Sequence, residues 1–296
     1  MKDLQLTRTI PTSELMLHTD GSIMHLRLKP GEVASTIILV GDPGRVALVA
    51  KHFTRVVKER KNREFHSLLG DYQGHPITVL STGIGAGSID IVMTEIDALW
   101  NIDLHERQAK PEHTPLRFIR IGTSGAIQED IANGDPVVSD YTVGLDGLAY
   151  WYSELQHCTD SELNRHLHDY LPVPDGAPMP YAVRSAPGLV SRLQTLGHHG
   201  MTLSMPGFYG PQARQLRLTP ALTKLVQRAN QFRHGDLRIL NMEMESGAVN
   251  AMATMLGHEA ITVSMAIDNR MANTATTKLK GRMDELIAET LHLAFV

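Results

Sequence analysis

Short apolar runs that lead into glycine-rich segments recur in the first half of the chain. Three of them are strand-length and mostly β-branched or aromatic: TIILV at 36–40, ITVL at 77–80 and FIRI at 118–121. The segments that follow them are GDPGR at 41–45, STGIGAGS at 81–88 and GTSGA at 122–126. Runs of this kind are typical of buried parallel strands that end in glycine turns.

Helical periodicity follows the first two glycine-rich segments, over residues 46–53 and 89–100. Because strands alternate with helices, the pattern predicts an α/β fold with a mixed, mainly parallel central β-sheet flanked by helices. Further strands are predicted over 136–143, 181–185, 201–205, 237–242 and 260–267, and further helices over 161–170, 188–196, 220–231, 244–256 and 278–295. The stretches 105–115 and 171–180 are predicted to be exposed loops, not linkers. We expect a single domain over residues 1–296, with an N-terminal arm over about residues 1–34.

Composition excludes several classes of protein. The 28 Lys and Arg residues face 32 Asp and Glu residues, so the chain lacks the basic excess of a general nucleic-acid binder. The single cysteine, Cys158, excludes a disulfide scaffold and suits a reducing compartment. The longest apolar runs are far shorter than the ~20 residues of a membrane span, and the N-terminus has no signal-peptide core. We therefore expect a cytoplasmic protein that binds neither nucleic acid nor membrane.

Two arginines stand beside the glycine-rich segments. Arg45 is the last residue of the first segment, and Arg120 lies two residues before Gly122 of the third. Ligands of open α/β sheets bind beyond the carboxyl ends of the strands, so the three glycine turns are expected to meet at one cleft. Forked guanidinium groups, helix-start N–H groups and the Thr123 hydroxyl are suitable donors for a phosphate. For Arg45 alone a solvated surface position is the commoner explanation, whereas Arg120 lies in an apolar run where an unpaired charge is costly.

Two cofactor classes find no support in the motifs. The string GIGAGS at 83–88 departs from a dinucleotide fingerprint, because its third glycine comes one position early and residues 100–105 resemble a helix end. The 15 histidines include no pair with convincing metal-ligand spacing, so structural or solvated roles are expected.

Three further segments are predicted to complete the cleft. In NMEMES at 241–246 we assign Glu243 to capping a helix and Glu245 to binding a ribose diol. The segment 208–214 combines an aromatic ring, an amide and a guanidinium, which suits stacking on a planar base and reading its carbonyl and imide edge. An ordinary surface loop explains that segment equally well. The sequence DNR at 268–270 follows a long apolar run and is expected at a carboxyl end too.

Taken in order, these motifs resemble the nucleoside phosphorylase superfamily, specifically its uridine phosphorylase branch. GDPGR at 41–45 resembles the first phosphate loop of the family, and REF at 63–65 resembles its arginine donated across a subunit interface. STGIG at 81–85, IRIGTSGA at 119–126 and EMES at 243–246 complete the set. The resemblance extends from residue 23 to the end of the chain.

The resemblance implies the nucleoside phosphorylase fold and the reaction uridine + phosphate = uracil + ribose 1-phosphate, a step of pyrimidine nucleoside salvage. Inorganic phosphate would be a co-substrate and no cofactor would be needed. The enzyme would be a homo-oligomer, at least a dimer, whose active sites are shared between protomers; related enzymes are often hexamers.

The resemblance also implies roles for individual residues. Phosphate would be bound by Gly41, Arg45, Arg120 and Thr123, together with Arg63 from a neighbouring protomer. Ribose would be bound by Glu245 and the Met244 backbone, with His25 of the neighbour, and the base by Phe208, Gln212, Arg214 and Arg270. Glu64, Ile84 and Ser88 match positions where some members bind a potassium ion at the dimer interface.

One position departs from the uridine-cleaving pattern. Relatives of that branch usually carry an aliphatic residue where this chain has Asp268, and an arginine two residues later, here Arg270. Bacterial purine-cleaving relatives carry an aspartate at about this position as a general acid to the base. Purine nucleoside phosphorolysis therefore stays open. So do a nucleosidase and a non-catalytic nucleoside-binding protein, although the paired arginines disfavour the nucleosidase, because water needs no anion clamp.

Overall fold

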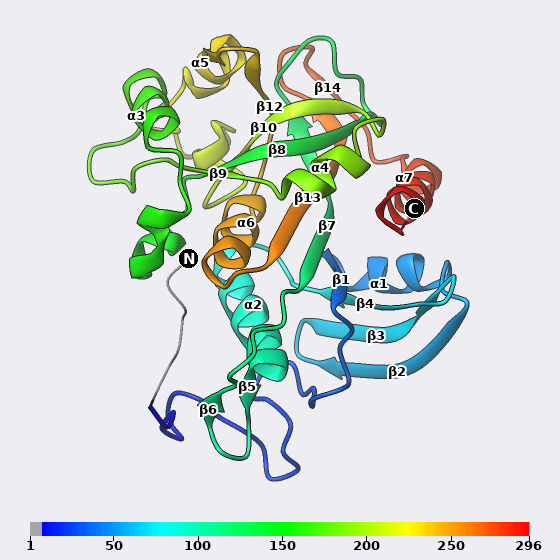
Figure 1. Ribbon diagram of the computed structural model, residues 1–296. Helices are drawn as coiled ribbons and strands as arrows, with labels where there is room; N and C mark the ends of the chain where they lie inside the picture. The colour runs from blue at the N-terminus through cyan, green and yellow to red at the C-terminus, as the bar shows by residue number, and fades with distance from the viewer. Residues whose placement is uncertain (1–7, 296) are drawn as a thin grey trace.

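The protein, described here by a computed structural model over residues 8–295, alternates strands and helices along most of its length (Figure 1). The helices are α1 (Pro43–Ala50), α2 (Ala86–Asn101), α3 (Ser161–Tyr170), α4 (Pro187–Arg192), α5 (Leu225–Gln231), α6 (Ser246–Met255) and α7 (Lys280–Phe295). The strands are β1 (Thr36–Val40), β2 (Arg55–Asn62), β3 (Phe65–Tyr72), β4 (His75–Ser81), β5 (Ile102–Asp103), β6 (Gln108–Ala109), β7 (Arg117–Ala126), β8 (Pro136–Gly144), β9 (Tyr181–Arg184), β10 (His198–Ser204), β11 (Arg233–His234), β12 (Leu237–Glu243), β13 (Glu259–Asn269) and β14 (Thr274–Ala275).

Twelve strands form one mixed sheet in the order β11-β12-β10-β8-β13-β7-β1-β4-β3-β2, with β9 beside β8 and β14 beside β13. The strands β4, β1, β7 and β13 are parallel neighbours, and so are β8, β10 and β12. The two parallel sets meet where β13 pairs antiparallel with β8. The predicted α/β class and the mainly parallel centre of the sheet are therefore confirmed.

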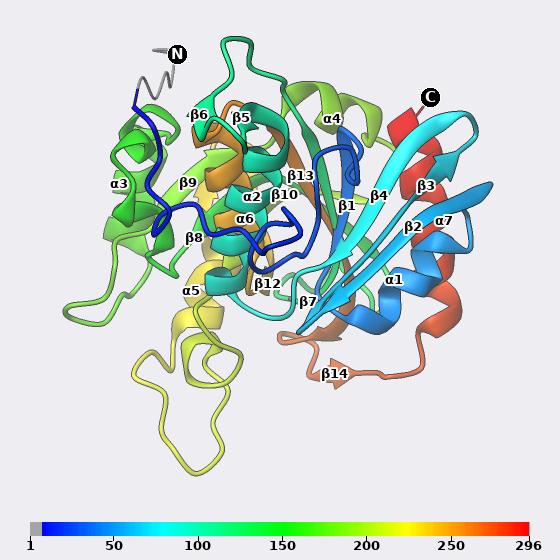
Figure 2. The same cartoon turned by 90° about the horizontal axis from the view of Figure 1, so that it is seen from below.

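At strand β1 the two faces of the sheet are covered by different helices. In β1, Ile37 and Leu39 belong to the hydrophobic cluster with α2 and α6, whereas Ile38 and Val40 belong to the cluster with α1 and α7. Figure 2 shows these helix pairs on opposite sides of the strands. Successive side chains of a strand point to opposite faces, so a strand covered on both faces needs the unbroken apolar run seen in the sequence.

The described part of the predicted N-terminal arm, from residue 8 onward, has no regular helix or strand and one isolated bridge between Leu17 and Ile23. Its apolar side chains nevertheless join the cluster around α2, where Leu15, Ile23 and Leu26 are buried. The arm is thus packed against the sheet by burial of scattered apolar residues and not by strand pairing.

Sequence analysis missed β2 and β3, which form an antiparallel hairpin at one edge of the sheet. The sequence of β2, RVVKERKN, is mostly charged, and its side chains are exposed or half-exposed. An edge strand with one solvated face can be polar on most positions, so it lacks the apolar run by which the buried strands were recognised.

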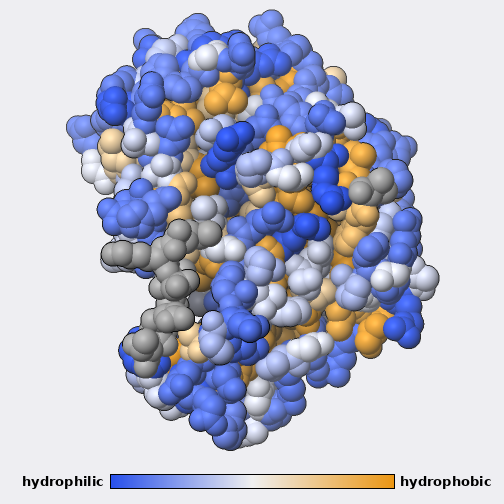
Figure 3. Space-filling view, in the orientation of Figure 1, coloured by the Kyte–Doolittle hydropathy of each residue, from blue (hydrophilic) through white to orange (hydrophobic). Residues whose placement is uncertain are grey.

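The face of the molecule seen in Figure 3 is mainly hydrophilic, with hydrophobic residues in separate small areas. No helix within residues 8–295 combines the length and the apolar character that crossing a bilayer requires.

Candidate active site

The register of the parallel strands brings the first two glycine loops level with Arg120. Leu39 of β1 pairs with Arg120 of β7, and Val40 pairs with Ser81 of β4. The loops that follow β1 and β4 come so close that a Cβ added at Gly41 would lie 3.4 Å from the Gly83 carbonyl oxygen. The predicted meeting of these loops at the carboxyl ends of the strands is confirmed.

The third glycine-rich segment, however, is not a turn. Residues 122–125 continue β7, so the prediction of a glycine turn in this segment is wrong. A Cβ at Gly122 would clash with Nη1 of Arg120 and lie 2.9 Å from its Cζ, and a Cβ at Gly125 would lie 2.7 Å from Oδ1 of Asp268. These glycines make room for side chains that fold back over the strand, a use of glycine that a local sequence pattern does not distinguish from a turn.

Arg120 is 3% exposed and lies between two carboxylates. Its Nη1 is 3.0 Å from Oε2 of Glu243, and its Nη2 pairs with Oε2 of Glu245. Burial alone lowers the pKa of the Arg120 guanidinium, but the two carboxylates outweigh burial and raise it. The Nε atom of Arg120 is buried and has no hydrogen-bond partner within the described part of the chain. Since buried donors are nearly always satisfied, this atom points to a bound acceptor.

The two glutamates make different contacts, and the predicted helix cap is confirmed for Glu243. The Glu243 carboxylate accepts from the backbone N–H of Glu245 at 2.9 Å, from the N–H of Ser246 at 3.0 Å and from the Ser246 hydroxyl at 2.6 Å, so it caps α6. Glu245 accepts from the N–H of Gly85, in the loop between β4 and α2, at 2.7 Å. Burial raises the pKa of Glu245, while the Arg120 charge opposes the rise. An ionised carboxylate has about four acceptor positions, so Glu245 keeps acceptor capacity beyond these two partners.

Arg45 lies half-buried in the first turn of α1 and donates from Nη1 to the Ile121 carbonyl at 3.2 Å. Burial lowers the pKa of its guanidinium, and the neighbouring charge of Arg120 lowers it further. The two arginines therefore converge and do not point apart into solvent. The backbone start of α1 contributes less than predicted, because the Gly44 N–H is taken by the Asp42 side chain at 2.8 Å.

A second group lies at the carboxyl end of β13 and consists of Phe208, Gln212, Arg214, Asp268 and Arg270, which we call the arginine–aspartate cluster. The Arg214 guanidinium lies 3.9 Å above the Phe208 ring centroid and 2.8 Å from Oδ2 of Asp268. Arg270 donates to the Gln212 carbonyl at 2.8 Å. We call the first group, Arg45, Arg120, Glu243 and Glu245, the arginine–glutamate cluster. Gly125 of β7 lies against Asp268 and Arg214, so one strand carries parts of both clusters.

Comparison with known proteins identifies the family of this chain. The sequence model of the Phosphorylase superfamily matches residues 35–293, which is most of the chain. The chain belongs to the phosphorylase superfamily. A uridine phosphorylase of Haemophilus influenzae is 30% identical over 265 residues, covering 86% of this chain and 91% of that protein. A DeoD-type purine nucleoside phosphorylase of Listeria welshimeri is 26% identical, covering 83% and 87%.

Among solved structures, a Trypanosoma brucei nucleoside phosphorylase, described as showing uridine phosphorylase activity, matches with a TM-score of 0.84 at 25% identity. The match covers 94% of this chain and 99% of that one. The nucleoside phosphorylase fold predicted from the motifs is thereby confirmed.

The two residues predicted to reach a neighbouring protomer, Arg63 and His25, lie outside both clusters of this phosphorylase-superfamily chain. Arg63 is exposed in the turn between β2 and β3, and His25 lies in the N-terminal arm. They are close neighbours, because the Asn62 amide donates to the His25 carbonyl at 2.7 Å. Within residues 8–295 no hydrogen bond or ion pair joins either side chain to the two clusters. Their contribution to an active site therefore stays a prediction that requires a neighbouring protomer.

Sequence analysis missed Glu95, which fixes the position of His25. The Glu95 carboxylate accepts from the backbone N–H of His25 at 3.0 Å and of Leu26 at 2.8 Å, and lies 2.6 Å from Nδ1 of His25. Glu95 is one of three acidic residues of α2. No local pattern separates a carboxylate that binds a distant loop from one that faces solvent, so no signal in the sequence marks it.

The residues matched to a potassium site lie together around the β4–α2 loop. A Cβ at Gly83 would lie 3.4 Å from Cγ of Glu64 and 3.9 Å from Oγ of Ser88. Ile84 in the same loop is 78% exposed. Met244 and Thr123 are half-buried, beside Glu245 and on β7 respectively.

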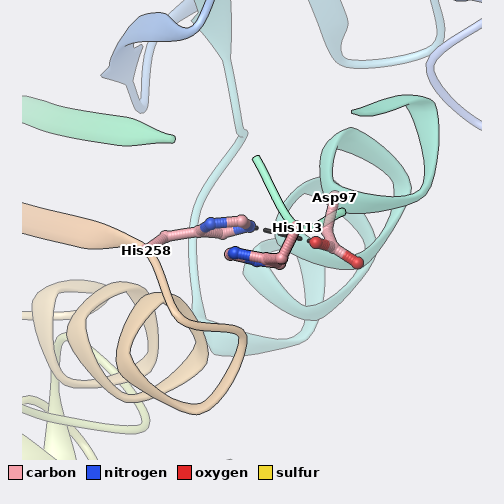
Figure 4. A group of neighbouring side chains, drawn as sticks. All are labelled: Asp97, His113 and His258. Carbon is pink, nitrogen blue, oxygen red and sulfur yellow. Dashed lines mark hydrogen bonds and ion pairs between the residues drawn. The ribbon is translucent and has the colours of Figure 1, made fainter. Parts of the chain in front are cut away.

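A separate group of titratable side chains, Asp97, His113 and His258, lies near the amino ends of β7 and β13 (Figure 4). The Leu116 N–H donates to Nδ1 of His258 at 3.2 Å, so the ring proton lies on Nε2, which faces Asp97 at 3.1 Å. A metal bound at Nε2 would move that proton to Nδ1, against the Leu116 donor. We therefore assign these side chains to connecting α2 with β13, in agreement with the structural role expected for the histidines.

A hollow of ≈ 250 Å³ opens at the amino ends of β1 and β7, beside Thr36, His75 and Arg117. It lies at the opposite end of these parallel strands from the two arginine clusters. Ligands of open α/β sheets bind at the carboxyl ends, so the clusters and not this hollow form the candidate active site.

Proposed function

We propose that the protein catalyses the reversible phosphorolysis of uridine, giving uracil and ribose 1-phosphate. Its curated relatives include several uridine phosphorylases at about 30% identity over most of the chain. The observation that carries the proposal is the buried Arg120 guanidinium, whose Nε lacks a partner among residues 8–295 and which converges with Arg45. Two neighbouring guanidinium groups suit a phosphate co-substrate, because their forked N–H donors match its oxygens.

In this reaction a phosphate oxygen attacks C1′ of the ribose while the bond from C1′ to N1 of uracil breaks. The electron pair of that bond leaves with the base, and the sugar passes through an oxocarbenium-like state, so no protein nucleophile is required. Arg45 and Arg120, with Gly41 and Thr123, hold the phosphate below the sugar, and Glu245 orients the diol. Donors from Gln212 and Arg214 stabilise the negative charge that develops on uracil. The rate gain comes from positioning and electrostatic stabilisation.

We also propose that active sites are shared in a homo-oligomer, with Arg63 reaching phosphate and His25 reaching the ribose of a neighbouring protomer. Support comes from their adjacent, solvent-accessible positions and from the exposed Ile84 nearby. A potassium ion at that interface would be held by oxygens of Glu64, Ile84 and Ser88 and would supply a bridging charge. The free thiol of Cys158 fits a reducing cytoplasm.

Purine nucleoside phosphorolysis is a second candidate, favoured by one observation. Asp268 lies against Arg214, the arginine predicted to meet the base, and DeoD-type purine nucleoside phosphorylases are among the relatives. The two candidates share the arginine–glutamate cluster and differ only in the base that departs.

The decisive experiment is release of free base from a panel of uridine, thymidine, deoxyuridine, inosine and cytidine, with and without phosphate. We expect uracil from uridine only when phosphate is present. The Arg120→Ala variant tests the role of Arg120 in the same assay. Its control is Arg238→Ala, because Arg238 forms an exposed ion pair with Asp130 on the same sheet. Phosphate-independent cleavage would show a nucleosidase, preferred cleavage of inosine would show a purine enzyme, and absence of turnover with every nucleoside would contradict both candidates.

A further inference from the structure

Asp268, the position that departs from the uridine-cleaving pattern, pairs with the arginine expected to read the base. Its Oδ2 lies 2.8 Å from Nη2 of Arg214. The other end of that guanidinium donates from Nη1 to the Phe208 carbonyl at 3.1 Å and to Oε1 of Gln212 at 2.5 Å. The Arg214 plane is thereby fixed at both ends, above the Phe208 ring.

An irregularity in β13 places Asp268 for this contact. Ala266 pairs with Ser124 of β7, but the next residue to pair is Asp268, with Gly125, so Ile267 is the extra residue of a β-bulge. Because side chains alternate along a strand, the bulge changes the face to which Asp268 points. Gly125 provides the space, since a Cβ there would lie 2.7 Å from Oδ1 of Asp268 and 3.2 Å from Nη2 of Arg214.

The Asp268 carboxylate also offsets the repulsion between two like charges, those of Arg214 and Arg270. Arg270 is half-buried and holds the loop through the carbonyls of Gln212 and Ala213. Burial lowers the pKa of Arg270, the Arg214 charge lowers it further, and Asp268 opposes both. Without Asp268, two guanidinium groups would face each other near the base with no carboxylate in contact with Arg214 in the described part of the chain.

The paired geometry defines what Arg214 and Gln212 offer to a ligand. Three of the five Arg214 donors are used by Phe208, Gln212 and Asp268, which leaves two. The Gln212 oxygen accepts from Arg214, so its amide NH₂ is the part that faces other partners. The remaining donors of Arg214 and Gln212 match ring carbonyl oxygens, while Oδ1 of Asp268 has no hydrogen-bond partner within residues 8–295 and is an acceptor beside them.

We propose that Asp268 is a positioning residue for Arg214, setting the guanidinium to bind a ring carbonyl of the base, and not a proton donor to a purine. The inference rests on the proposed phosphorolysis and adds to it a positioning residue for the arginine that meets the base. Oδ2 of Asp268 accepts a hydrogen bond from Arg214 in this arrangement, so that oxygen serves to hold the guanidinium.

The test uses the full-length enzyme and separates the two Michaelis constants. In Asp268→Asn and Asp268→Ser we expect the KM for uridine to rise by about tenfold or more, while the KM for phosphate changes by less than about twofold. A general loss of structure would alter both constants. Asp130→Asn is the matched control, since it breaks an exposed carboxylate–arginine pair with Arg238 and is expected to change neither constant.

A double-mutant cycle identifies the partner through which Asp268 acts. Arg214→Gln alone is expected to raise the uridine KM at least as much as Asp268→Asn, and adding Asp268→Asn to Arg214→Gln is expected to raise it no further. An additive effect would overturn the inference, and so would an unchanged uridine KM in Asp268→Asn. Loss of inosine cleavage with uridine cleavage intact would instead make Asp268 the acid of a purine enzyme. A wild-type enzyme that releases no uracil refutes the proposed function itself, an outcome that is seen before any variant is made.

Discussion

The two arginine clusters differ in how far their charged side chains are removed from water. In the arginine–glutamate cluster the side chains of Arg120, Glu243 and Glu245 are buried, and each charge contacts an opposite one. In the arginine–aspartate cluster Arg214 and Asp268 keep partial exposure, and Phe208 is 45% exposed. Charges that are fully desolvated act strongly on a neighbouring group but leave no tolerance for a missing partner.

The backbone that supports each cluster differs in the same way. Arg120 and Glu243 belong to β7 and β12, which pair with each other in the interior of the sheet. Phe208 and Arg214 belong to a loop between β10 and α5, and the neighbouring Ala213 has a positive φ of 55°. Residues on a sheet are held in fixed positions, whereas loops vary more in sequence between related proteins and are more mobile. We infer that the first cluster fixes the reaction and the second selects the base.

The largest effect is expected from Arg120→Ala. It removes a phosphate donor and leaves two buried carboxylates without a counter-charge, so we expect kcat/KM to fall by about 10³-fold and stability by about 3–5 kcal/mol. Phosphate-dependent uracil release and thermal unfolding measure the two effects. Arg120→Lys retains the charge without the guanidinium fork; it should remain folded and still lose about 10²-fold. Unchanged turnover in both variants contradicts the role of Arg120.

A smaller loss is expected from Gly122→Ala, because the new methyl group would displace the Arg120 guanidinium that lies over it. We expect about a 10²-fold loss of kcat/KM, since a displacement of about 1 Å is costly in a preorganised site. Gly281→Ala is the control: this glycine is exposed in α7 with nothing within 4 Å of an added Cβ, and the change should raise stability by about 0.5–1 kcal/mol. Equal activity in the two variants would show that Gly122 is only a strand glycine.

Arg120 and Gly122 also show which features of the site the sequence predicts and which it does not. Arg120 was identified because a charge within an apolar run needs a partner, and the partners proved to be the glutamates of the other predicted motif. Gly122 was predicted to form a turn, which is wrong. A side chain at this position would clash with the Arg120 guanidinium, which folds back over β7 from two residues away. Buried strands and motifs are local patterns, and they were predicted well.

Contacts between distant segments were not predictable in the same way. The Arg214–Asp268 pair joins residues 54 positions apart, and the Glu95–His25 pair joins residues 70 apart. Each depends on the sheet order and, for Asp268, on a one-residue bulge. The sequence placed both members of the first pair in one cleft but did not show that they bind each other.

The pH dependence of the reaction is expected to depend on the buried cluster. Burial raises the pKa of Glu245 above its ordinary 4.5, so its proton binds at a higher pH than that of an exposed glutamate. As the pH falls through this raised pKa, the carboxylate loses its charge and its ability to accept from ribose hydroxyls, and activity falls. The acid limb of kcat/KM should therefore lie above pH 4.5 and disappear in the residual activity of Glu245→Gln. A wild-type acid limb that persists unchanged in that variant would assign the titration to another group.

The smallest effect is expected at the exposed edge of the base-selecting cluster, from Phe208→Ala. The ring supports Arg214 through a cation–π contact at 3.9 Å, which is worth about 0.5–1 kcal/mol at a partly exposed position. We expect the uridine KM to rise about twofold to fivefold, with kcat and the phosphate KM nearly unchanged. Leu218→Ala is the matched control, because Leu218 is an apolar residue of the same loop that is 86% exposed. Steady-state kinetics in both substrates test this expectation. If kcat of Phe208→Ala fell by the same factor as the uridine KM rises, the loop would take part in the chemical step. The division between a fixed cluster and a base-selecting cluster would then not hold.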